Sequence, residues 1–230
     1  ATLEEAQFRR GELLFTLKSY PASEQAYNAV LAMNSQTAFR DRALYMQGWS
    51  RFKQAKLEDG LQSFFGVLDG KLADRGDELL ENLKDLSRGD RELVEDTFRV
   101  MSLSLANLQG AESIGAYTKT DARRAYEFRV YQQLGELYIK QERVKDAADT
   151  FGAFVRKNPM HAQAPVLAAR VIDIYEGGGF ANLALDAKKG RPQPVWKIAY
   201  AGAVGGQTLT GIPAIERLRE KFPALKIWPF

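Results

Sequence analysis

The apolar positions between residues 131 and 159 recur with helical spacing and predict two consecutive amphipathic helices. Those of the first helix lie three, four and seven residues apart and share one face; they are Tyr131, Leu134, Gly135 and Tyr138. Those of the second follow a polar turn at 141–143 and are Val144, Ala147, Phe151 and Phe154. Pro159 ends the pair, because proline cannot continue a helix. The pattern predicts an antiparallel hairpin that needs stacked neighbours to cover its outer face.

Two earlier segments repeat this pattern. In residues 3–33, Gly11 stands where Gly135 stands in the first hairpin, and in residues 39–69 the equivalent is Gly48. The interval from Gly11 to Gly48 is close to a repeat period of about 34 residues. After Pro159, residues 161–176 predict another first helix and residues 180–189 a shorter second helix.

The interval between Gly48 and Gly135 is longer than two periods and predicts a less regular pair. Four leucines form one helical stripe, at positions 79, 80, 83 and 86. A longer stripe between residues 93 and 108 predicts a helix capped by Asp90. Residues 109–120 are expected to form a loop or a short irregular helix, and the next pair begins near Asp121.

The helical spacing of apolar residues ends after residue 190. Residues 195–201 and 225–228 are expected to form strands, and residues 213–222 a helix opened by proline. Two strands and one helix have little stability alone. The sequence therefore predicts a helical repeat domain at residues 1–190 and a short α/β segment at residues 191–230, interpreted as a foreign or truncated fragment.

On the residues above, the segment 3–189 resembles the tetratricopeptide-repeat (TPR) family, of the bacterial exported or envelope-associated kind. The resemblance implies an all-α solenoid of antiparallel hairpins that binds partners and catalyses nothing. The tail 192–230, through residues 205–213 and 227–230, resembles a fragment of a predicted ribonuclease-H-like family. No acidic metal-binding set carries over, because the tail has no aspartate and its two glutamates lie on one predicted helix.

The TPR resemblance places ligand contacts on the inner face of the first helix of each hairpin. In the second repeat these positions are Arg42, Tyr45, Trp49, Phe52 and Lys53, and in the repeat of Gly135 they are Arg129, Gln132, Glu136, Ile139 and Lys140. The three aromatics of the second repeat share a face, and aromatics flanked by cations are typical of binding hot spots. The alternative is that Trp49 only packs against the next repeat.

The composition excludes several kinds of partner and catalytic site. The net charge of +3 comes from a surplus of four basic side chains after position 190, so the segment 1–190 is close to neutral; no nucleic-acid partner is expected. The absence of cysteine excludes disulfides and thiolate catalysis. Lone His161 lacks ligand-spaced neighbours, the loop 202–211 lacks the lysine of a phosphate cradle, and both Arg-Gly-Asp tripeptides, at 75–77 and 88–90, are interpreted as helix caps.

The preferred hypothesis is a non-enzymatic scaffold, without cofactor or metal, whose concave groove holds a peptide or a helix of a partner protein. The sequence contains no run of about 18 apolar residues, the length needed to span a bilayer. The expected location is periplasmic or envelope-associated, with the cytoplasm as the alternative. Two other hypotheses concern the tail. It could belong to a nucleic-acid-processing or nucleotide-binding enzyme, or its strands could pair between chains and build a homo-oligomer.

Overall fold

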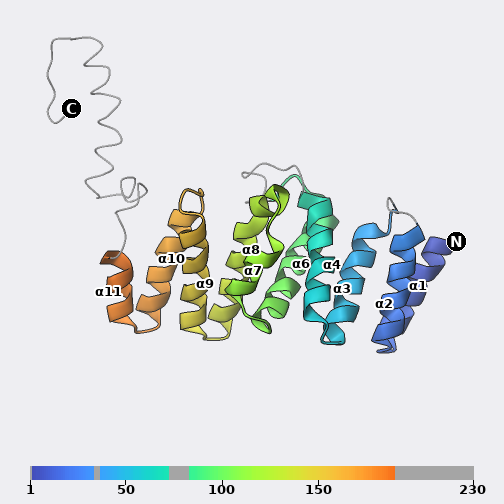
Figure 1. Cartoon of the computed structure of the whole chain (residues 1–230), viewed down its shortest axis with the longest axis horizontal. Helices are drawn as coiled ribbons and strands as arrows, with labels where there is room; N and C mark the ends of the chain where they lie inside the picture. The colour runs from blue at the N-terminus through green and yellow to red at the C-terminus, as the bar shows by residue number, and fades with distance from the viewer. Residues whose placement is uncertain (1, 34–36, 73–82, 190–230) are drawn as a thin grey trace, which may run out of the picture. The chain divides into compact units, whose positions relative to one another are not determined.

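The structure is a computed structural model that describes residues 2–33, 37–72 and 83–189. These residues form helices joined by turns, with no strand among them (Figure 1). The helices are α1 (Leu3–Thr16), α2 (Tyr20–Met33), α3 (Arg40–Lys53), α4 (Leu57–Leu72), α6 (Arg88–Ala106), α7 (Ala111–Tyr117), α8 (Asp121–Lys140), α9 (Val144–Lys157), α10 (Ala164–Gly177) and α11 (Ala181–Lys189). The predicted all-α class is confirmed for this part of the chain. The predicted α/β segment, its ribonuclease-H-like resemblance and the loop 202–211 lie outside the described residues.

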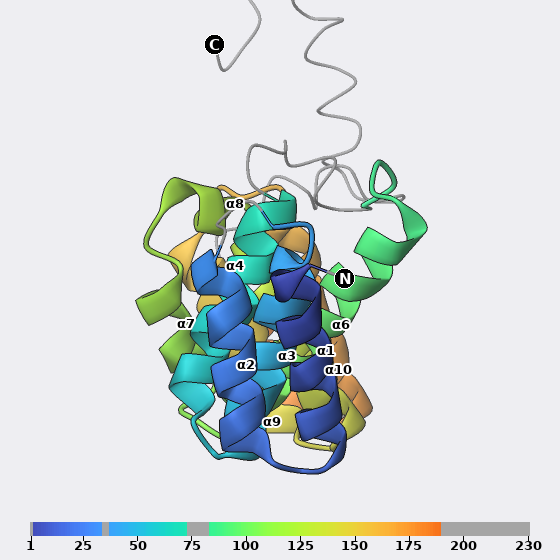
Figure 2. The ribbon, with the colours of Figure 1, turned by 90° about the vertical axis from the view of Figure 1, so that its right-hand side faces the viewer.

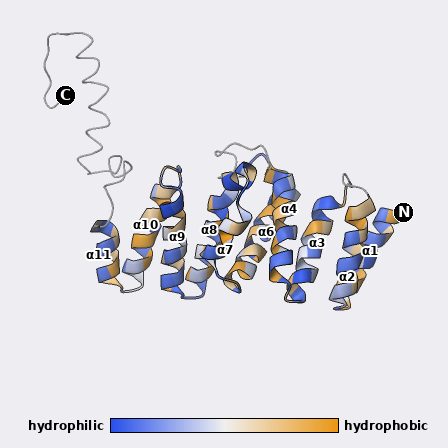
Figure 3. Cartoon of the chain, in the orientation of Figure 1, coloured by the Kyte–Doolittle hydropathy of each residue, from blue (hydrophilic) through white to orange (hydrophobic). Residues whose placement is uncertain are grey.

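The chain divides into two compact units, one ending at Ile174 and the other beginning at Tyr175. In the first unit, α1, α2, α3 and α4 each pack against the next helix, followed by α6, α8 and α9. Figure 2 shows α2 and α7 on one side of this unit and α1 and α6 on the other. Each helix carries both hydrophobic and hydrophilic residues (Figure 3). In the second unit, Lys188 of α11 forms an ion pair with Glu176.

Three glycines allow the helices of their hairpins to touch. A Cβ atom on Gly11 would lie 2.7 Å from Cζ of Tyr27, one on Gly48 would lie 2.5 Å from Cε1 of Phe64, and one on Gly135 would lie 2.5 Å from Cε1 of Phe151. The same sequence interval separates each ring from its glycine, and each ring is fully buried. The three hairpins are therefore equivalent at the positions that the sequence predicted, which makes the unit a TPR-like helical repeat.

The turns inside these hairpins are equivalent too. The residue seven positions after each glycine has a left-handed backbone conformation, with φ of 60° at Lys18, 61° at Ala55 and 59° at Glu142. The next N–H then bonds to the carbonyl five residues earlier, as in Lys56 to Arg51. This cap satisfies carbonyls at the end of the first helix and turns the chain back.

The centre of the first unit corrects two predictions. The N-cap of α6 is Ser87, whose Oγ accepts a hydrogen bond from the Asp90 N–H at 3.1 Å, so the prediction that Asp90 caps the helix was wrong. Asp90 lies in the first turn of α6 instead, where its carboxylate pairs with Lys71 at 2.7 Å. Leu83 and Leu86 are buried in a turn rather than in a helix, because Leu83 takes a φ of 52°. Leu79 and Leu80 lie outside the described residues.

Predicted boundaries near the key hairpin hold closely. Residues 111–117 form the short helix α7, α8 begins at Asp121 after the N-cap Thr120, and α9 ends at Lys157 just before Asn158-Pro159. Helix α10 begins at Ala164, slightly later than expected. Residues 158–163 form a turn there, in which the Gln163 N–H donates to Nδ1 of His161 at 3.1 Å.

Partly buried ion pairs connect helices of different hairpins. Asp69 of α4 accepts hydrogen bonds from Arg123 at 2.6 Å and from the Tyr126 hydroxyl at 2.8 Å, both on α8. Burial and the Asp69 charge raise the pKa of Tyr126. Glu24 of α2 plays the same role toward the second hairpin, where it pairs with Arg51 at 2.8 Å and Lys56 at 2.9 Å.

Glu24 is expected to make stability depend on acid pH. Burial by itself raises its pKa, but hydrogen bonds from Arg51, Lys56 and Gln54 outweigh burial and lower the pKa to about 2 from 4.5. The stabilisation is therefore complete above pH 4.5 and is lost as the pH falls toward 2. Because Lys56 is half exposed, we expect Glu24→Gln to cost about 1–2 kcal/mol at pH 7.

Urea unfolding followed by circular dichroism at pH 7 and at pH 3 measures this effect. The difference between wild type and Glu24→Gln should shrink by at least half at pH 3. The control Asp173→Asn, at an exposed carboxylate of α10, should change stability by less than about 0.5 kcal/mol at either pH. An equal cost of Glu24→Gln at both pH values would contradict the assignment.

Candidate partner-binding sites

Three half-buried aromatic side chains follow one another along α3. The rings of Tyr45 and Trp49 meet edge to face at 6.5 Å, and those of Trp49 and Phe52 at 5.5 Å. The Nζ of exposed Lys53 lies 5.7 Å from the Trp49 ring centre, within the range of a cation–π contact. Exposed Arg42 lies one turn before Tyr45 on the same helix. These five residues, predicted from the sequence, form a continuous strip that is partly accessible.

Tyr45 also has a structural function that sequence reasoning missed. Its hydroxyl donates a hydrogen bond to Asp96 of α6, and its ring packs at 6.1 Å against Phe64. Burial, helped by the bond to Asp96, raises the pKa of Tyr45 to about 12. Arg99 holds the other carboxylate oxygen of Asp96 through its Nε, at 2.6 Å. The tyrosine hydroxyl therefore links α3 to α6, while Trp49 and Phe52 remain partly exposed.

The predicted contacts on α8 divide in the same way. Gln132 and Lys140 are exposed. Glu136 pairs with Arg170 of α10 at 3.3 Å. The guanidinium of Arg129 lies 5.4 Å from the Phe98 ring centre, and burial lowers its pKa, although the charge of Glu95 opposes the shift. Arg129 and Glu136 thus connect helices of the repeat, and Gln132 and Lys140 remain accessible.

Helix α6 connects these two groups, because Asp96 accepts a hydrogen bond from Tyr45 of α3 and Phe98 contacts Arg129 of α8. The structure therefore joins the α3 strip and the α8 residues through α6 and not by direct contact. Asp96 and Arg99 on α6 are part of the same surface and were not predicted. Their close spacing was visible, but α6 has no close-approach glycine from which to number its face.

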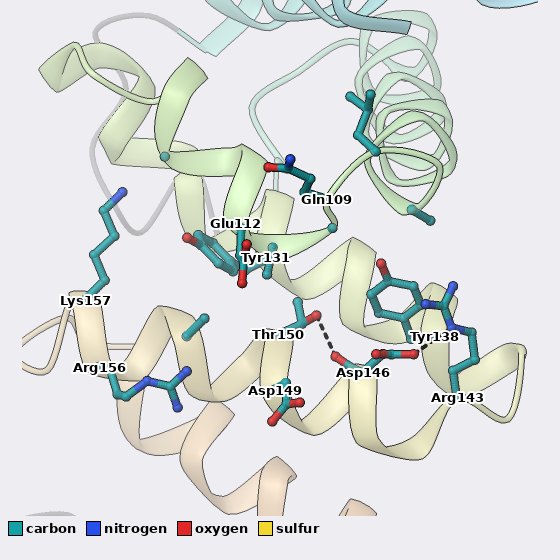
Figure 4. Close-up of a pocket in the computed structure, with 16 residues that line it drawn as sticks. Gln109, Glu112, Tyr131, Tyr138, Arg143, Asp146, Asp149, Thr150, Arg156 and Lys157 are labelled. Carbon is teal, nitrogen blue, oxygen red and sulfur yellow. Dashed lines mark hydrogen bonds and ion pairs between the residues drawn. The ribbon is translucent and has the colours of Figure 1, made fainter. Parts of the chain in front are cut away.

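A cleft of about 620 Å³ lies between α7 and α9 (Figure 4). One wall comes from the end of α6 and from α7, with Gln109 and Glu112, and the other comes from α9. Tyr131 and Tyr138 of α8 contribute rings to it. The Tyr131 ring is almost fully buried, and burial with the charge of Glu127 raises its pKa to about 12. Sequence reasoning did not anticipate this cleft.

The charges of the cleft are only partly neutralised. On α9, Arg143 pairs with Asp146 at 2.7 Å. Lys157 bonds to buried Glu127 at 2.5 Å. The exposed carboxylates of Glu112 and Asp149 stand on opposite walls (Figure 4) and belong to no ion pair within the described chain.

Comparisons with known proteins add neighbours of low similarity. No family model and no curated protein matches the sequence. Among solved structures, the chain is similar to a thermophilic TPR protein from Thermus thermophilus, with 16% identity over 80% of this chain and 87% of that one and a TM-score of 0.32. It is also similar to an assembly chaperone of RpL4, with 11% identity over 95% of this chain and 100% of that one and a TM-score of 0.29. Both scores are low, so the TPR-like character of the repeats rests on their shared glycine, ring and turn positions.

Other sequence motifs have structural explanations. The His161 ring packs against Phe128 at 5.4 Å and Phe154 at 5.2 Å. The tripeptide 88–90 lies in the first turn of α6, with Asp90 bound to Ser87 and Lys71. The described residues contain no group of three or more potential metal ligands. No helix within the described ranges is long and apolar enough to cross a membrane.

Proposed function

We propose that this protein is a non-enzymatic interaction scaffold, and that the face formed by the first helices of its hairpins binds a peptide or a helix of a partner protein. The single observation that carries the proposal is the aromatic strip of α3. The packing face of α3 is already filled where Gly48 touches Phe64, so Trp49 and Phe52 are not needed for that contact. Half-buried aromatics next to cations are the residues that protein interfaces use as anchors.

The contacts indicate that some residues of this face bind the partner and others hold the helices in place. Trp49 and Phe52 bury apolar area of the partner, while Lys53 and Arg42 attract its carboxylates or backbone carbonyls. Gln132 and Lys140 of α8 offer further polar contacts for a longer ligand. Tyr45, Arg129 and Glu136 hold the helices of this face at their spacing through Asp96, Phe98 and Arg170. The proposal requires no cofactor. A periplasmic or envelope location, with the cytoplasm as the alternative, belongs to the same proposal.

Truncating Trp49 tests the proposal. Wild type, Trp49→Ala and the control Phe180→Ala, at an exposed aromatic of the second unit, are immobilised in turn, and proteins captured from a bacterial envelope extract are quantified by mass spectrometry. We expect Trp49→Ala to lose at least tenfold of a partner that wild type and Phe180→Ala both retain. Unchanged circular dichroism confirms that the variant is folded. Equal capture by all three proteins would show that Trp49 is not a binding residue.

A further inference from the structure

The cleft between α7 and α9 arises because one second helix is short. Helix α7 has 7 residues, whereas α2 and α9 have 14 and α4 has 16. One end of α7 is tied to α4, where Tyr117 stacks on Phe65 at 5.4 Å. The space beside α9 is therefore less filled than the space beside a second helix of full length.

The size of the cleft matches a short helix. A helix of two turns is about 10 Å long and about 10 Å across, so it occupies on the order of 800 Å³. The cleft measures about 620 Å³. Its walls are partly apolar, with the Tyr131 ring, Leu108 and Ala153 among the lining residues. The cleft can therefore take a short helix that has one apolar face.

The charge around the cleft indicates which polar side chains such a helix should carry. Glu112 and Asp149 line the cleft as exposed carboxylates, and Glu58 and Asp59 border a neighbouring hollow that shares Leu108 with it. The guanidinium of Arg156 is the cation among these lining residues that has no ion pair within the described chain. The other cations are paired, Arg143 with Asp146, Lys157 with Glu127 and Lys56 with Glu24. The uncompensated charge is negative, so it attracts lysine or arginine side chains.

We propose that the cleft between α7 and α9 binds a short, basic amphipathic helix of a partner protein, with its apolar face on Leu108 and Ala153 and its cations toward Glu112 and Asp149. This site lies on the layer of second helices and is separate from the α3 strip. The affinity for the basic helix should fall as the salt concentration rises, because the carboxylates of Glu112 and Asp149 are exposed and salt screens their attraction for its cations. The two sites can be occupied or lost independently.

The test uses a short fluorescent peptide of leucine and lysine at helical spacing, titrated with the full chain and followed by anisotropy at physiological ionic strength. An analogue with glutamate in place of lysine serves as the peptide control. The double variant Glu112→Lys/Asp149→Lys and the cleft-filling variant Ala153→Trp are each expected to raise the Kd for the lysine peptide at least tenfold. The double variant Asp173→Lys/Asp186→Lys carries the same charge change at exposed residues that do not line the cleft and should stay within twofold, as should Trp49→Ala.

Several outcomes would overturn the proposal. Equal weakening by both double charge variants would show general electrostatic attraction, and equal binding of the two peptides would exclude a basic ligand. A photoreactive residue at position 153 that cross-links to residues 190–230 would assign the cleft to the chain itself. A dimer in solution that Ala153→Trp dissociates would assign it to a second copy. If Ala153→Trp fails to fold, the exposed double charge variants still test whether the peptide binds at Glu112 and Asp149.

Discussion

Gly135→Ala is expected to lower the free energy of unfolding by about 1–2 kcal/mol, because overpacking a core outweighs the better helix propensity of alanine. The new methyl group would lie 2.5 Å from Cε1 of Phe151, with all three of the nearest ring atoms within 2.9 Å. That ring is fully buried and cannot move without displacing its neighbours. Alanine contributes about 1 kcal/mol of helix propensity, but overpacking costs about 1–3 kcal/mol or more. Urea unfolding followed by circular dichroism measures the difference.

Two variants separate the clash from the general effect of adding a methyl group. Gly89→Ala places the methyl group on α6 with no atom within 4 Å, so it should stabilise by about 0.5–1 kcal/mol. Combining Gly135→Ala with Phe151→Leu should cost at least about 1 kcal/mol less than the sum of the single changes, because the smaller side chain makes room. If Gly135→Ala stabilises as much as Gly89→Ala, the close approach does not exist.

Glu127→Ala is expected to cost about 3 kcal/mol, because it removes one partner of a buried ion pair. The Glu127 carboxylate is 1% exposed and accepts hydrogen bonds from Thr118, from Lys157 at 2.5 Å and from Asn158 at 3.2 Å. It thereby ties α8 to the ends of α7 and α9. Its removal leaves a cavity and deprives several donors of their acceptor, and the loss of one partner from a buried ion pair costs about 3–5 kcal/mol. Lys157 is 40% exposed and can turn to water, which places the estimate at the lower end.

Two control variants show how much of this cost comes from the buried carboxylate of Glu127. Glu127→Gln retains an acceptor for Thr118 and Asn158 and should cost about 1–2 kcal/mol. Glu142→Ala, at an exposed turn residue, should cost less than about 0.5 kcal/mol. Thermal unfolding of the three variants under one set of conditions ranks them. A cost of Glu127→Ala no greater than that of Glu142→Ala would mean that Glu127 is not a buried link.

The hairpins could be predicted because their determinants are local in sequence. Gly48 and Phe64 belong to consecutive helices, and the turn at Ala55 lies between them, so one short stretch of chain contains the whole packing unit. Helix α6 has no such glycine, and its N-cap is Ser87 instead of the predicted Asp90. Where two polar residues near a helix start are three positions apart, only geometry decides which one precedes the first turn.

The candidate sites were less predictable because long-range contacts decide which side chains remain accessible. Tyr45 and Asp96 are 51 residues apart, and Glu136 and Arg170 are 34 apart. No local pattern shows that these predicted binding residues have partners within the chain. The cleft beside α7 had a weaker signal. The interval between Leu108 and Thr118 is too short for a second helix of full length, and a shorter helix leaves a space in its layer.

Site-specific photo-cross-linking of the isolated complex with its partner tests most directly whether the first helices form the binding face. A photoreactive residue is placed at Arg42 of α3, at Gln132 of α8 or at Gln25, which is exposed on the second helix α2. We predict that positions 42 and 132 cross-link to the same partner protein and that position 25 does not. Cross-links at position 25 with none at positions 42 and 132 would contradict the proposed binding face.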